Sequence, residues 1–511
     1  MLRPAWSGAA QGVFTYTYNN RFLLTGWQLD AISQTLGYDA DGLLTSYGPY
    51  TITRNGPGRT ASLLRDNVMT TTLGYDSLAR VISRTHTAAG QPVYQVQLAY
   101  DNVGRISTRT ETAGSTHVFT YTYDADGRLS QVQRDGAVIE AYTYDLNGNR
   151  LSKQLNAGPI VTATYDTQDR LLALGNTAYQ FDVDGYLKQR GSDTFRYSAR
   201  GELISATVGA QTITYAYDAL NRRVSRSDVN GTTQYLYGNP NNPFQVSAVR
   251  SAGGQLSVFY YDDNGLIFAL DRNGARYTIA TDQVGSPRVV ADAAGQVVKA
   301  IEYDSFGNVV SDSAPGFDLP IGFAGGLSDA ATGLVRFGYR DYDPAAGRWT
   351  ARDPIFFGGQ QANLYVYVGN DPINLRDPLG LWCIGVSLYE GIGGGVQTCI
   401  TSEGASFCGE VGFGVGVNVG IDNGGLEPPG SEIGVEGKAV FGGVGGVGLN
   451  IKFDDCGLSY TPAGELGPIT FDPSKGGLQP TIDGGPAWLL KNGKISAQAK
   501  LYGKVCTQGK W

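Results

Sequence analysis

Hydrophobic and polar residues alternate in short segments over the first two-thirds of the chain. The segments TYTY at 120–123 and ITYAY at 213–217 are typical, and each ends at an aspartate. Alternation with a period of two places every second side chain on one face of a strand. The segments recur at intervals of mostly 16–25 residues, which suits two short strands and two turns. The pattern therefore predicts a mainly β fold built from many short strands.

The same turn follows most of these segments, which makes the chain a degenerate repeat with the unit Tyr-Asp-x-x-Gly-Arg-Leu. The aspartate can cap the backbone of its own turn, and the glycine can take a positive φ. The tyrosine can bury its ring while its hydroxyl finds a partner. Because one unit cannot bury its apolar face alone, the units are predicted to stack into one continuous sheet. The Tyr-Asp residues are then structural residues of this wall, without a catalytic role. Clear copies begin at Tyr38, Tyr75, Tyr100, Tyr123, Tyr144, Tyr165, Tyr217 and Tyr303, and weaker ones at Phe181 and Tyr197.

Composition narrows the class of protein. The chain has a net charge of −8, only 17% charged residues and 31 tyrosines. An acidic chain without a basic run is a poor nucleic-acid binder. No apolar run reaches the roughly 18–20 residues that a membrane-spanning helix requires, and the first residues lack the apolar core of a secretory signal. We therefore expect a secreted or cell-surface protein to leave the cell by a specialised export route.

The repeat resembles that of the RHS/YD-repeat family over about 16–381. Eight Tyr-Asp copies in register with Gly-Arg-Leu carry the resemblance. It implies a β-sheet that spirals into a hollow shell, in a longer protein with an N-terminal delivery or docking domain. The first residues already look like the middle of a repeat. We therefore expect residues 1–312 to form a shell that is incomplete at its N-terminus.

A second motif lies at 336–381, where Arg-x-Tyr-Asp-Pro precedes three further Asp-Pro steps, at Asp353, Asp371 and Asp377. Residues 313–381 resemble the RHS-associated core domain, which plugs one end of the shell. In members that release a toxin, this domain is an intramolecular aspartyl protease that cuts after the leucine of Asp-Pro-x-Gly-Leu. The residues that the resemblance assigns to this reaction are catalytic Arg340, Asp353 and Asp377, and the bond between Leu381 and Trp382.

The chemistry of paired carboxyl groups gives a modest argument of its own. Two carboxyl groups held close together cannot both ionise at little cost, so they share a proton. One can then activate water while the other protonates the carbonyl or the leaving amine, and an arginine can hold a carboxylate ionised or orient it. The 24 residues between Asp353 and Asp377 leave open whether they meet. The alternative is that Asp-Pro steps form turns, which we favour for Asp343 and Asp371.

The remaining residues of this stretch are assigned to structure, with one departure from the family pattern. Phe356 stands where the first Asp-Pro step often has glycine, and this puts cleavage in question. The residues assigned to packing or structure are Arg348, Arg376, Asn363, Tyr365 and Tyr367.

Residues 382–511 are glycine-rich and hold all five cysteines. They contain eight lysines, twelve aspartates and glutamates, and no histidine or arginine. This disfavours His-based nucleases, Cys-His proteases and, by net charge, nucleases in general. Alternating apolar residues predict at least four strands, at about 411–421, 433–441, 447–453 and 495–505.

Three interpretations of the function of residues 382–511 remain open. Strands with one apolar face suit a membrane-active cargo. They equally suit a soluble β-domain that binds a partner or is inert, or an enzyme that uses only carboxylates, Lys, Ser or Cys. Five cysteines allow at most two disulfides, and the absence of Cys-x-x-Cys argues against zinc. We predict no metal and no cofactor.

The sequence therefore predicts three domains: a repeat shell (1–312), a core plug with an autocleavage motif (313–381) and a variable tail (382–511). The family resemblance implies a polymorphic toxin of interbacterial competition, in which the shell encloses the tail and cleavage after Leu381 releases it. It also implies an immunity protein for the tail and a delivery machinery. The alternative of a different class is a non-cleaving surface or wall-associated protein that binds carbohydrate or a protein partner. Continuity of the chain at 381–382 distinguishes the two.

Overall fold

The computed structural model divides into two compact units, Met1–Trp382 and Cys383–Trp511. The residues that it describes in the first unit are 5–6, 12–29, 32–56, 59–65, 69–240, 242–262, 264–356 and 361–381. Those described in the second unit are 392–401, 404–413, 435–441, 444–454, 457–463, 469–470, 481–482 and 501–509.

The first unit is one antiparallel meander in which every strand from β1 to β31 pairs with the next strand along the chain. The first strands are β1 (Ala5–Trp6), β2 (Gly12–Tyr18), β3 (Leu24–Leu29), β4 (Ile32–Tyr38), β5 (Leu44–Tyr47), β6 (Tyr50–Arg54), β7 (Thr60–Arg65), β8 (Met69–Tyr75), β9 (Val81–Ala88) and β10 (Gln91–Tyr100). They are followed by β11 (Ile106–Ala113), β12 (Ser115–Tyr123), β13 (Leu129–Arg134), β14 (Ala137–Tyr144), β15 (Arg150–Leu155), β16 (Val161–Tyr165), β17 (Leu171–Leu174), β18 (Thr177–Phe181), β19 (Leu187–Arg190), β20 (Asp193–Tyr197) and β21 (Leu203–Val208). The last are β22 (Gln211–Tyr217), β23 (Arg223–Asp228), β24 (Gly231–Leu236), β25 (Ala248–Arg250), β26 (Leu256–Tyr261), β27 (Ile267–Arg272), β28 (Ala275–Thr281), β29 (Pro287–Asp292), β30 (Val297–Tyr303) and β31 (Val309–Asp312).

The turn that follows Tyr123 shows how the repeat unit works. Asp124 Oδ1 accepts the backbone N–H of Arg128 at 2.9 Å, and Asp124 Oδ2 lies 2.7 Å from Arg128 Nε. Gly127 closes the turn with φ +83°. The Arg128 guanidinium then lies 5.0 Å over the ring of Tyr144, the next repeat tyrosine, whose hydroxyl donates to Leu129 O at 2.7 Å. Each repeat is therefore tied to the following one by its arginine and its tyrosine.

The copies that lack the turn glycine keep the same turn. Ala79, Asp169 and Asn221 stand at the glycine position with φ of 69°, 61° and 66°. In the copy that begins at Tyr197, Ser198 Oγ takes the role of the aspartate and accepts the N–H of Glu202 at 3.3 Å. The turn geometry therefore tolerates several residues at both positions, and the weaker copies are full members of the wall.

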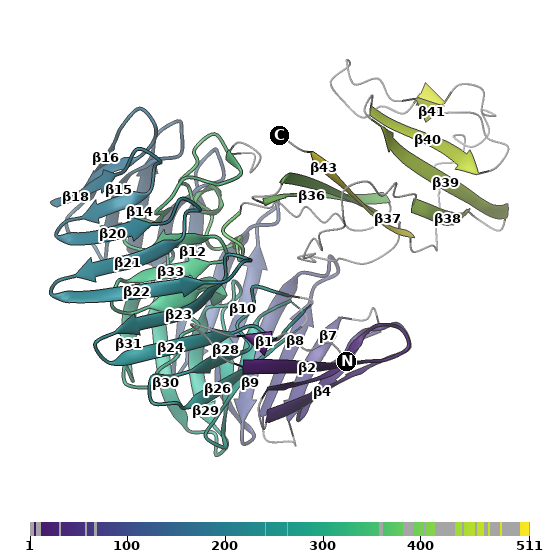
Figure 1. The fold of residues 1–511 in the computed structure, drawn as a ribbon, viewed down its shortest axis with the longest axis horizontal. Helices are drawn as coiled ribbons and strands as arrows, with labels where there is room; N and C mark the ends of the chain where they lie inside the picture. The colour runs from purple at the N-terminus through teal and green to yellow at the C-terminus, as the bar shows by residue number, and fades with distance from the viewer. Residues whose placement is uncertain are drawn as a thin grey trace. The chain divides into compact units, whose positions relative to one another are not determined.

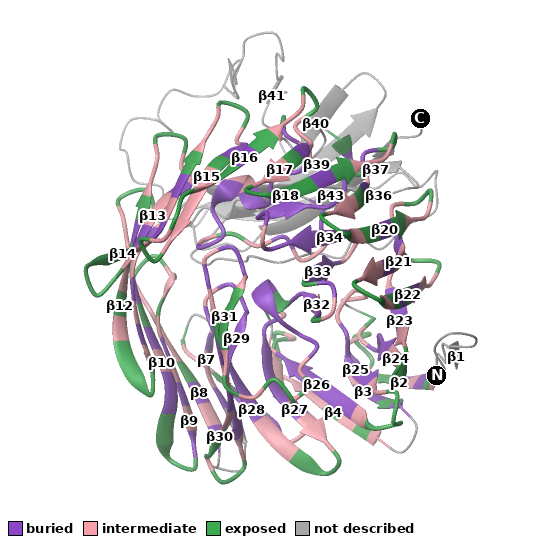
Figure 2. Ribbon diagram, turned by 90° about the vertical axis from the view of Figure 1, so that its left-hand side faces the viewer, coloured by how far each residue is buried: buried purple, intermediate pink, exposed green. Residues whose placement is uncertain are grey.

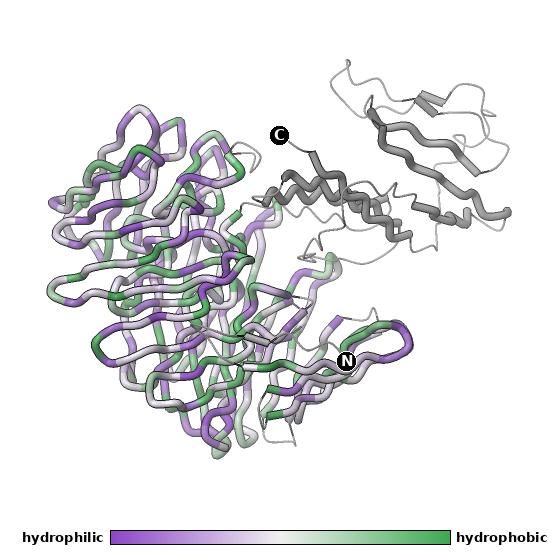
Figure 3. The backbone as a smooth tube through the Cα atoms, in the orientation of Figure 1, coloured by the Kyte–Doolittle hydropathy of each residue, from purple (hydrophilic) through white to green (hydrophobic). Residues whose placement is uncertain are grey.

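The sheet winds back on itself, so that late strands cover early ones (Figure 1). One hydrophobic cluster combines residues of β2–β7, such as Phe14, Trp27 and Tyr50, with residues of β23–β29, such as Phe259 and Tyr260. Polar contacts join the same layers, as where Gln34 Nε2 donates to the Tyr260 hydroxyl at 2.7 Å. The predicted spiralling β fold is confirmed. Hydrophobic and hydrophilic stretches are interspersed along the wall in Figure 3.

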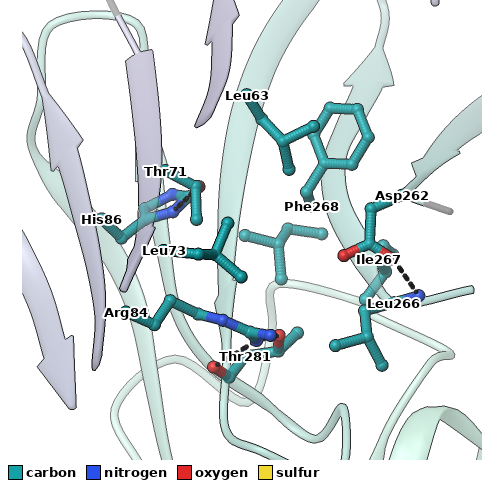
Figure 4. A pocket seen from close by; sticks show the side chains of 11 residues that line it. Leu63, Thr71, Leu73, Arg84, His86, Asp262, Leu266, Ile267, Phe268 and Thr281 are labelled. Carbon is teal, nitrogen blue, oxygen red and sulfur yellow. Dashed lines mark hydrogen bonds between the residues drawn. The ribbon is translucent and has the colours of Figure 1, made fainter. Parts of the chain in front are cut away.

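A narrow crevice between β7–β9 on one side and β27, β28 and the turn before β27 on the other lies where these layers meet (Figure 4). His86 on its wall is 2% exposed and is held between the hydroxyls of Thr71 and Thr278. Burial, and secondarily the nearby Arg84 guanidinium, lower the pKa of His86 to about 3. The ring is therefore neutral at physiological pH and serves as a hydrogen-bonded link between layers.

The wall surrounds a small plug (Figure 2) made of a four-stranded sheet. Its elements are the 3₁₀ turn η1 (Phe323–Gly325), the strands β32 (Leu327–Asp329), β33 (Leu334–Phe337), β34 (Arg340–Asp343) and β35 (Arg348–Trp349), and the 3₁₀ turn η3 (Val368–Asn370). Three buried aspartates of the plug pair with wall arginines. These pairs are Asp329 with Arg226 at 3.0 Å, Asp341 with Arg223 at 2.7 Å and Asp343 with Arg190 at 3.3 Å.

The second unit is described as separate strands. They form the sheets β36–β37–β43, β38–β39–β40 and β41–β42, with the strands β36 (Ile392–Thr401), β37 (Gly404–Phe413), β38 (Val435–Phe441), β39 (Val444–Asp454), β40 (Gly457–Ala463), β41 (Ile469–Thr470), β42 (Thr481–Ile482) and β43 (Leu501–Gly509). The predicted strand at 447–453 lies within β39, whereas 414–421, 433–434 and 495–500 lie outside the described residues. In the antiparallel register of β37 and β43, Cys408 stands opposite Cys506. Within the described residues, the chain has no helix of the length and apolarity that crossing a membrane takes.

Candidate functional site

Arg340 begins β34 and is almost completely buried, with 2% of its surface exposed. Its guanidinium lies 4.1 Å from the centre of the Trp349 ring, which holds the planar group from one side. Leu364 O accepts from Arg340 Nη1 at 3.3 Å, and Gly380 O accepts from Nε. The side chain is therefore fixed by the plug on several sides.

The structure brings together the three residues that the sequence analysis singled out for catalysis. Arg340 Nη2 lies 2.8 Å from Asp353 Oδ2 and 3.4 Å from Asp377 Oδ2. Asp353 is 5% exposed and Asp377 is 3% exposed. One guanidinium nitrogen thus holds two buried carboxyl groups that are far apart in the sequence.

Asp353 is positioned by the turn at Asp353-Pro354, and Phe356 does not prevent this. Asp353 Oδ1 accepts the N–H of Ile355 at 3.0 Å, and Asp353 O accepts the N–H of Phe356 at 3.0 Å. Phe356 adopts a φ of 51°, a conformation that favours glycine, and its side chain is 47% exposed beside Arg352. The departure from the family pattern therefore places strain in the turn while leaving Asp353 directed at Arg340.

The turn at Asp377-Pro378 brings the backbone N–H of Leu381 to the Asp377 carboxyl group. Asp377 Oδ1 accepts the N–H of Leu381 at 3.1 Å, and Gly380 N donates to Asp377 O at 3.3 Å. Gly380 has a φ of 63°, and a Cβ there would lie 2.5 Å from Phe337 O. Leu381 is 2% exposed. Trp382 lies outside the described residues.

Burial and neighbouring charges shift the pKa values of Asp377 and Arg340. Burial raises the pKa of Asp377 to about 6; the Arg340 charge opposes this shift and the Asp353 charge adds to it. Burial also lowers the pKa of Arg340 below its ordinary value, against the two carboxylates that raise it. Asp377 is therefore a group that can carry a proton near neutral pH, and the Arg340 guanidinium lies between it and Asp353.

The other predicted residues of this stretch lie in supporting positions. Asp343 Oδ1 accepts the N–H of Ala345 at 3.0 Å, and Asp371 Oδ1 accepts the N–H of Asn374 at 3.3 Å, so both close turns as expected. Arg348, Asn363, Tyr365 and Tyr367 are buried in the plug or against the wall, whereas Arg376 donates to Asn264 O. Sequence reasoning missed Trp349 and the carbonyl of Leu364, because no spacing rule links a carbonyl or a ring to a distant arginine. No group of three or more potential metal ligands occurs among the residues whose positions the structure gives.

Comparison with known proteins identifies the family of the shell. The model of the teneurin YD-shell matches residues 2–373. The chain belongs to the YD-shell family. The match ends ahead of Asp377 and Leu381, so it covers the wall and most of the plug.

Relatives of this YD-shell protein include two vertebrate teneurins. Teneurin-4 of Homo sapiens is 33% identical over 396 residues, and Teneurin-3 of Danio rerio is 33% identical over 400 residues. Each match covers 73% of this chain and 14% of the relative, so the chain spans about a seventh of the length of these relatives.

Solved structures share the fold of the YD-shell protein. The crystal structure of TcdB2-TccC3-Cdc42 matches with a TM-score of 0.62 at 20% identity and covers 72% of this chain and 22% of that chain. The structure of the Photorhabdus luminescens Tc holotoxin pore matches with a TM-score of 0.62 at 20% identity, over 73% of this chain and 21% of that chain. Together with the family match, this confirms the predicted RHS/YD-repeat family and its β-shell fold.

Proposed function

We propose that this YD-shell protein cuts its own chain between Leu381 and Trp382 and so detaches residues 382–511. One observation carries the proposal: Asp377, which shares Arg340 Nη2 with Asp353, accepts the N–H of Leu381 at 3.1 Å. The carboxyl pair is thereby tied to the residue that would supply the scissile carbonyl. The wall and plug provide the enclosed, water-poor setting in which such groups act strongly.

The proposed reaction divides the acid and base roles by charge. Asp353, 2.8 Å from Arg340 Nη2, is the ionised base that takes a proton from water. The hydroxide attacks the Leu381 carbonyl carbon, and the bond to Trp382 N breaks. Asp377 gives its proton to that nitrogen, which leaves Asp377 ionised and Asp353 protonated. Arg340 stabilises the negative charge of the pair throughout.

The first test is the intact mass of the purified chain. We expect the wild type to yield two fragments that meet at Leu381–Trp382, and Asp377→Asn to stay whole, because asparagine cannot donate the acid proton. The expected loss of cleavage rate is at least about 10²-fold. Asp371→Asn is the matched control, since Asp371 is also a buried Asp-Pro residue with a pKa raised to about 6 but contacts Asn374 in place of Arg340. A wild-type chain that stays at 54.4 kDa after native folding would refute the proposal.

The rate of this cleavage is expected to fall as pH rises above 6. The acid proton on Asp377 has a pKa of about 6, so the reactive form is lost above that pH, roughly tenfold per pH unit. The raised pKa of Asp377 also affects the stability of the fold. Because the folded pKa exceeds the ordinary value of 3.8, the protonated carboxyl group contributes stability that is fully present below pH 3.8. This stability is lost as the pH rises through about 6. Refolding the denatured chain at a series of pH values and quantifying the fragments checks the profile. A rate that increases steadily above pH 6 would contradict the assignment of Asp377 as the acid.

The biological role that fits this reaction is that of a secreted or cell-surface toxin with a detachable effector. The shell would keep residues 382–511 away from the producing cell, and delivery would need a partner outside this chain. An immunity protein that binds the tail would protect the producer. Co-expression of the tail with the product of a small neighbouring gene, and recovery of growth, tests this part separately from cleavage.

A shell that stays whole and binds a partner at the cell surface is the second candidate. The observation that favours it is the 33% identity to teneurins of human and zebrafish over 73% of the chain, together with the family match over residues 2–373. In that case carbohydrate or protein would bind the wall, and both Asp377→Asn and the wild type would remain intact.

A further inference from the structure

A serine, a histidine and an aspartate form a connected chain at one end of the β12–β14 hairpins. Ser115 Oγ lies 2.9 Å from His117 Nε2, and His117 Nδ1 lies 2.6 Å from Asp135 Oδ2. Ser115 and His117 are alternate residues of β12, so they share one face of the strand. Asp135 reaches them from the turn between β13 and β14. This arrangement is far from Arg340 in the sequence and uses none of the groups assigned to self-cleavage.

The aspartate is locked in place by the backbone. Asp135 Oδ1 accepts the N–H of Val118 at 2.8 Å, and Asp135 N donates to Val118 O at 2.8 Å. The Val118 N–H, and secondarily His117, lower the pKa of Asp135 below its ordinary value, so its carboxylate is ionised. An ionised carboxylate can only accept hydrogen bonds, so the proton between Asp135 and His117 belongs to His117 Nδ1.

This proton assignment decides the chemistry of the other ring nitrogen. When Nδ1 of a neutral imidazole carries the proton, Nε2 is an acceptor. In that neutral form the Ser115 hydroxyl donates to Nε2, which is the orientation that a general base requires. The order of contacts, from hydroxyl to imidazole to carboxylate, matches the arrangement that activates serine nucleophiles on unrelated folds.

The serine is open to small molecules. Ser115 is exposed, and the side chains of His117 and Asp135 are 32% and 50% exposed. A Cβ on the preceding Gly114 would have no atom within 4 Å apart from its chain neighbours, so the wall leaves open space at this end of β12. A planar ester can therefore approach Ser115 without movement of the wall.

We propose that Ser115 is a nucleophile that accepts acyl groups from carboxylic esters, with His117 as its general base and Asp135 as the residue that orients His117. Ser115 Oγ forms a bond to the acyl carbon, its proton passes to His117 Nε2, and the ester C–O bond breaks as that proton moves to the leaving oxygen. Water then attacks the acyl carbon and gives a proton to His117. The bond between the acyl carbon and Ser115 Oγ breaks, the carboxylic acid leaves, and His117 returns the proton to Oγ. The reaction needs no oxidant, metal or further reactant.

The test uses the full chain with two probes, a fluorophosphonate and p-nitrophenyl acetate. We expect the fluorophosphonate to modify the wild type on the peptide that contains Ser115. Ester hydrolysis should fall by about 10² in Ser115→Ala, the lower end of what general-base catalysis contributes, because the groups are partly exposed. Asp135→Asn keeps an oxygen for the Val118 N–H and removes the charge that orients His117, so it should lose most of the activity while remaining folded.

Ser130→Ala is the matched control, since Ser130 Oγ donates to the Thr122 carbonyl at 3.0 Å and has no histidine partner. It should hydrolyse ester and be modified at Ser115 as the wild type is. An unmodified wild type, or equal modification and hydrolysis in Ser115→Ala, would overturn the proposal. Asp377→Asn should leave both readouts unchanged, so failure of self-cleavage and failure of this site are separable.

Discussion

Replacing Asp341 with alanine is expected to lower the free energy of unfolding by about 3–5 kcal/mol. Asp341 is 1% exposed and lies 2.7 Å from Arg223 Nη2 and 2.8 Å from Arg336 Nη1. Arg223 belongs to the wall and Arg336 to the plug, so the carboxylate joins the two. Without it, two buried guanidinium groups would face each other with no counter-charge. Denaturant unfolding followed by tryptophan fluorescence measures the loss.

The control for this prediction is a paired aspartate on the surface. Asp126 lies 2.9 Å from Arg128, but its side chain is 64% exposed. Solvent screens such a pair, so Asp126→Ala should change stability by less than about 0.5 kcal/mol. If Asp341→Ala cost no more than Asp126→Ala, the buried pair would not be what joins plug to wall.

Replacing Gly380 with alanine is expected to lower the free energy of unfolding by about 2–4 kcal/mol and to stop the proposed self-cleavage. An L residue at φ 63° costs about 1–2 kcal/mol, and the new Cβ would lie 2.5 Å from Phe337 O and 2.9 Å from Arg340 N. Backbone atoms cannot turn away, so the chain must shift at the point where Arg340 meets Gly380 O. Denaturant unfolding and intact mass measure the two effects on the same sample.

Gly333→Ala separates the clash from the cost of the backbone conformation. Gly333 also lies in the plug, has a φ of 68°, and offers a new Cβ no atom within 4 Å. We expect it to cost about 1 kcal/mol and to leave cleavage intact. Equal effects of the two substitutions would show that the close contact at Gly380 is unimportant.

The wall was predictable because its interactions are local. Within a turn, the aspartate contacts residues no more than four positions away, and the strand alternation is visible in the same segments, as in the unit around Asp124. The winding that brings Gln34 to Tyr260 was not predictable in register, because it depends on the accumulated twist of many strands.

The candidate site was predictable in its residues and not in its geometry. The family resemblance pointed to Asp353 and Asp377, but the arginine that joins them is fixed by Trp349 and by the carbonyls of Leu364 and Gly380. These partners carry no sequence signal. The His117 cluster was equally hidden, since only the pairing of β12 with β13 brings Asp135 beside His117.

The neighbour-by-neighbour order of the wall has a consequence for the timing of folding. Each hairpin can form as soon as its two strands leave the ribosome, because its pairing partner is always the segment just made. The plug comes after thirty-one such strands, and its buried aspartates need arginines that the wall has already placed. Arg340 can therefore pair with Asp353 and Asp377 only once synthesis of residues 1–381 is complete. Because the wall is synthesised before the plug, any chemistry at Leu381 is delayed until the wall has formed.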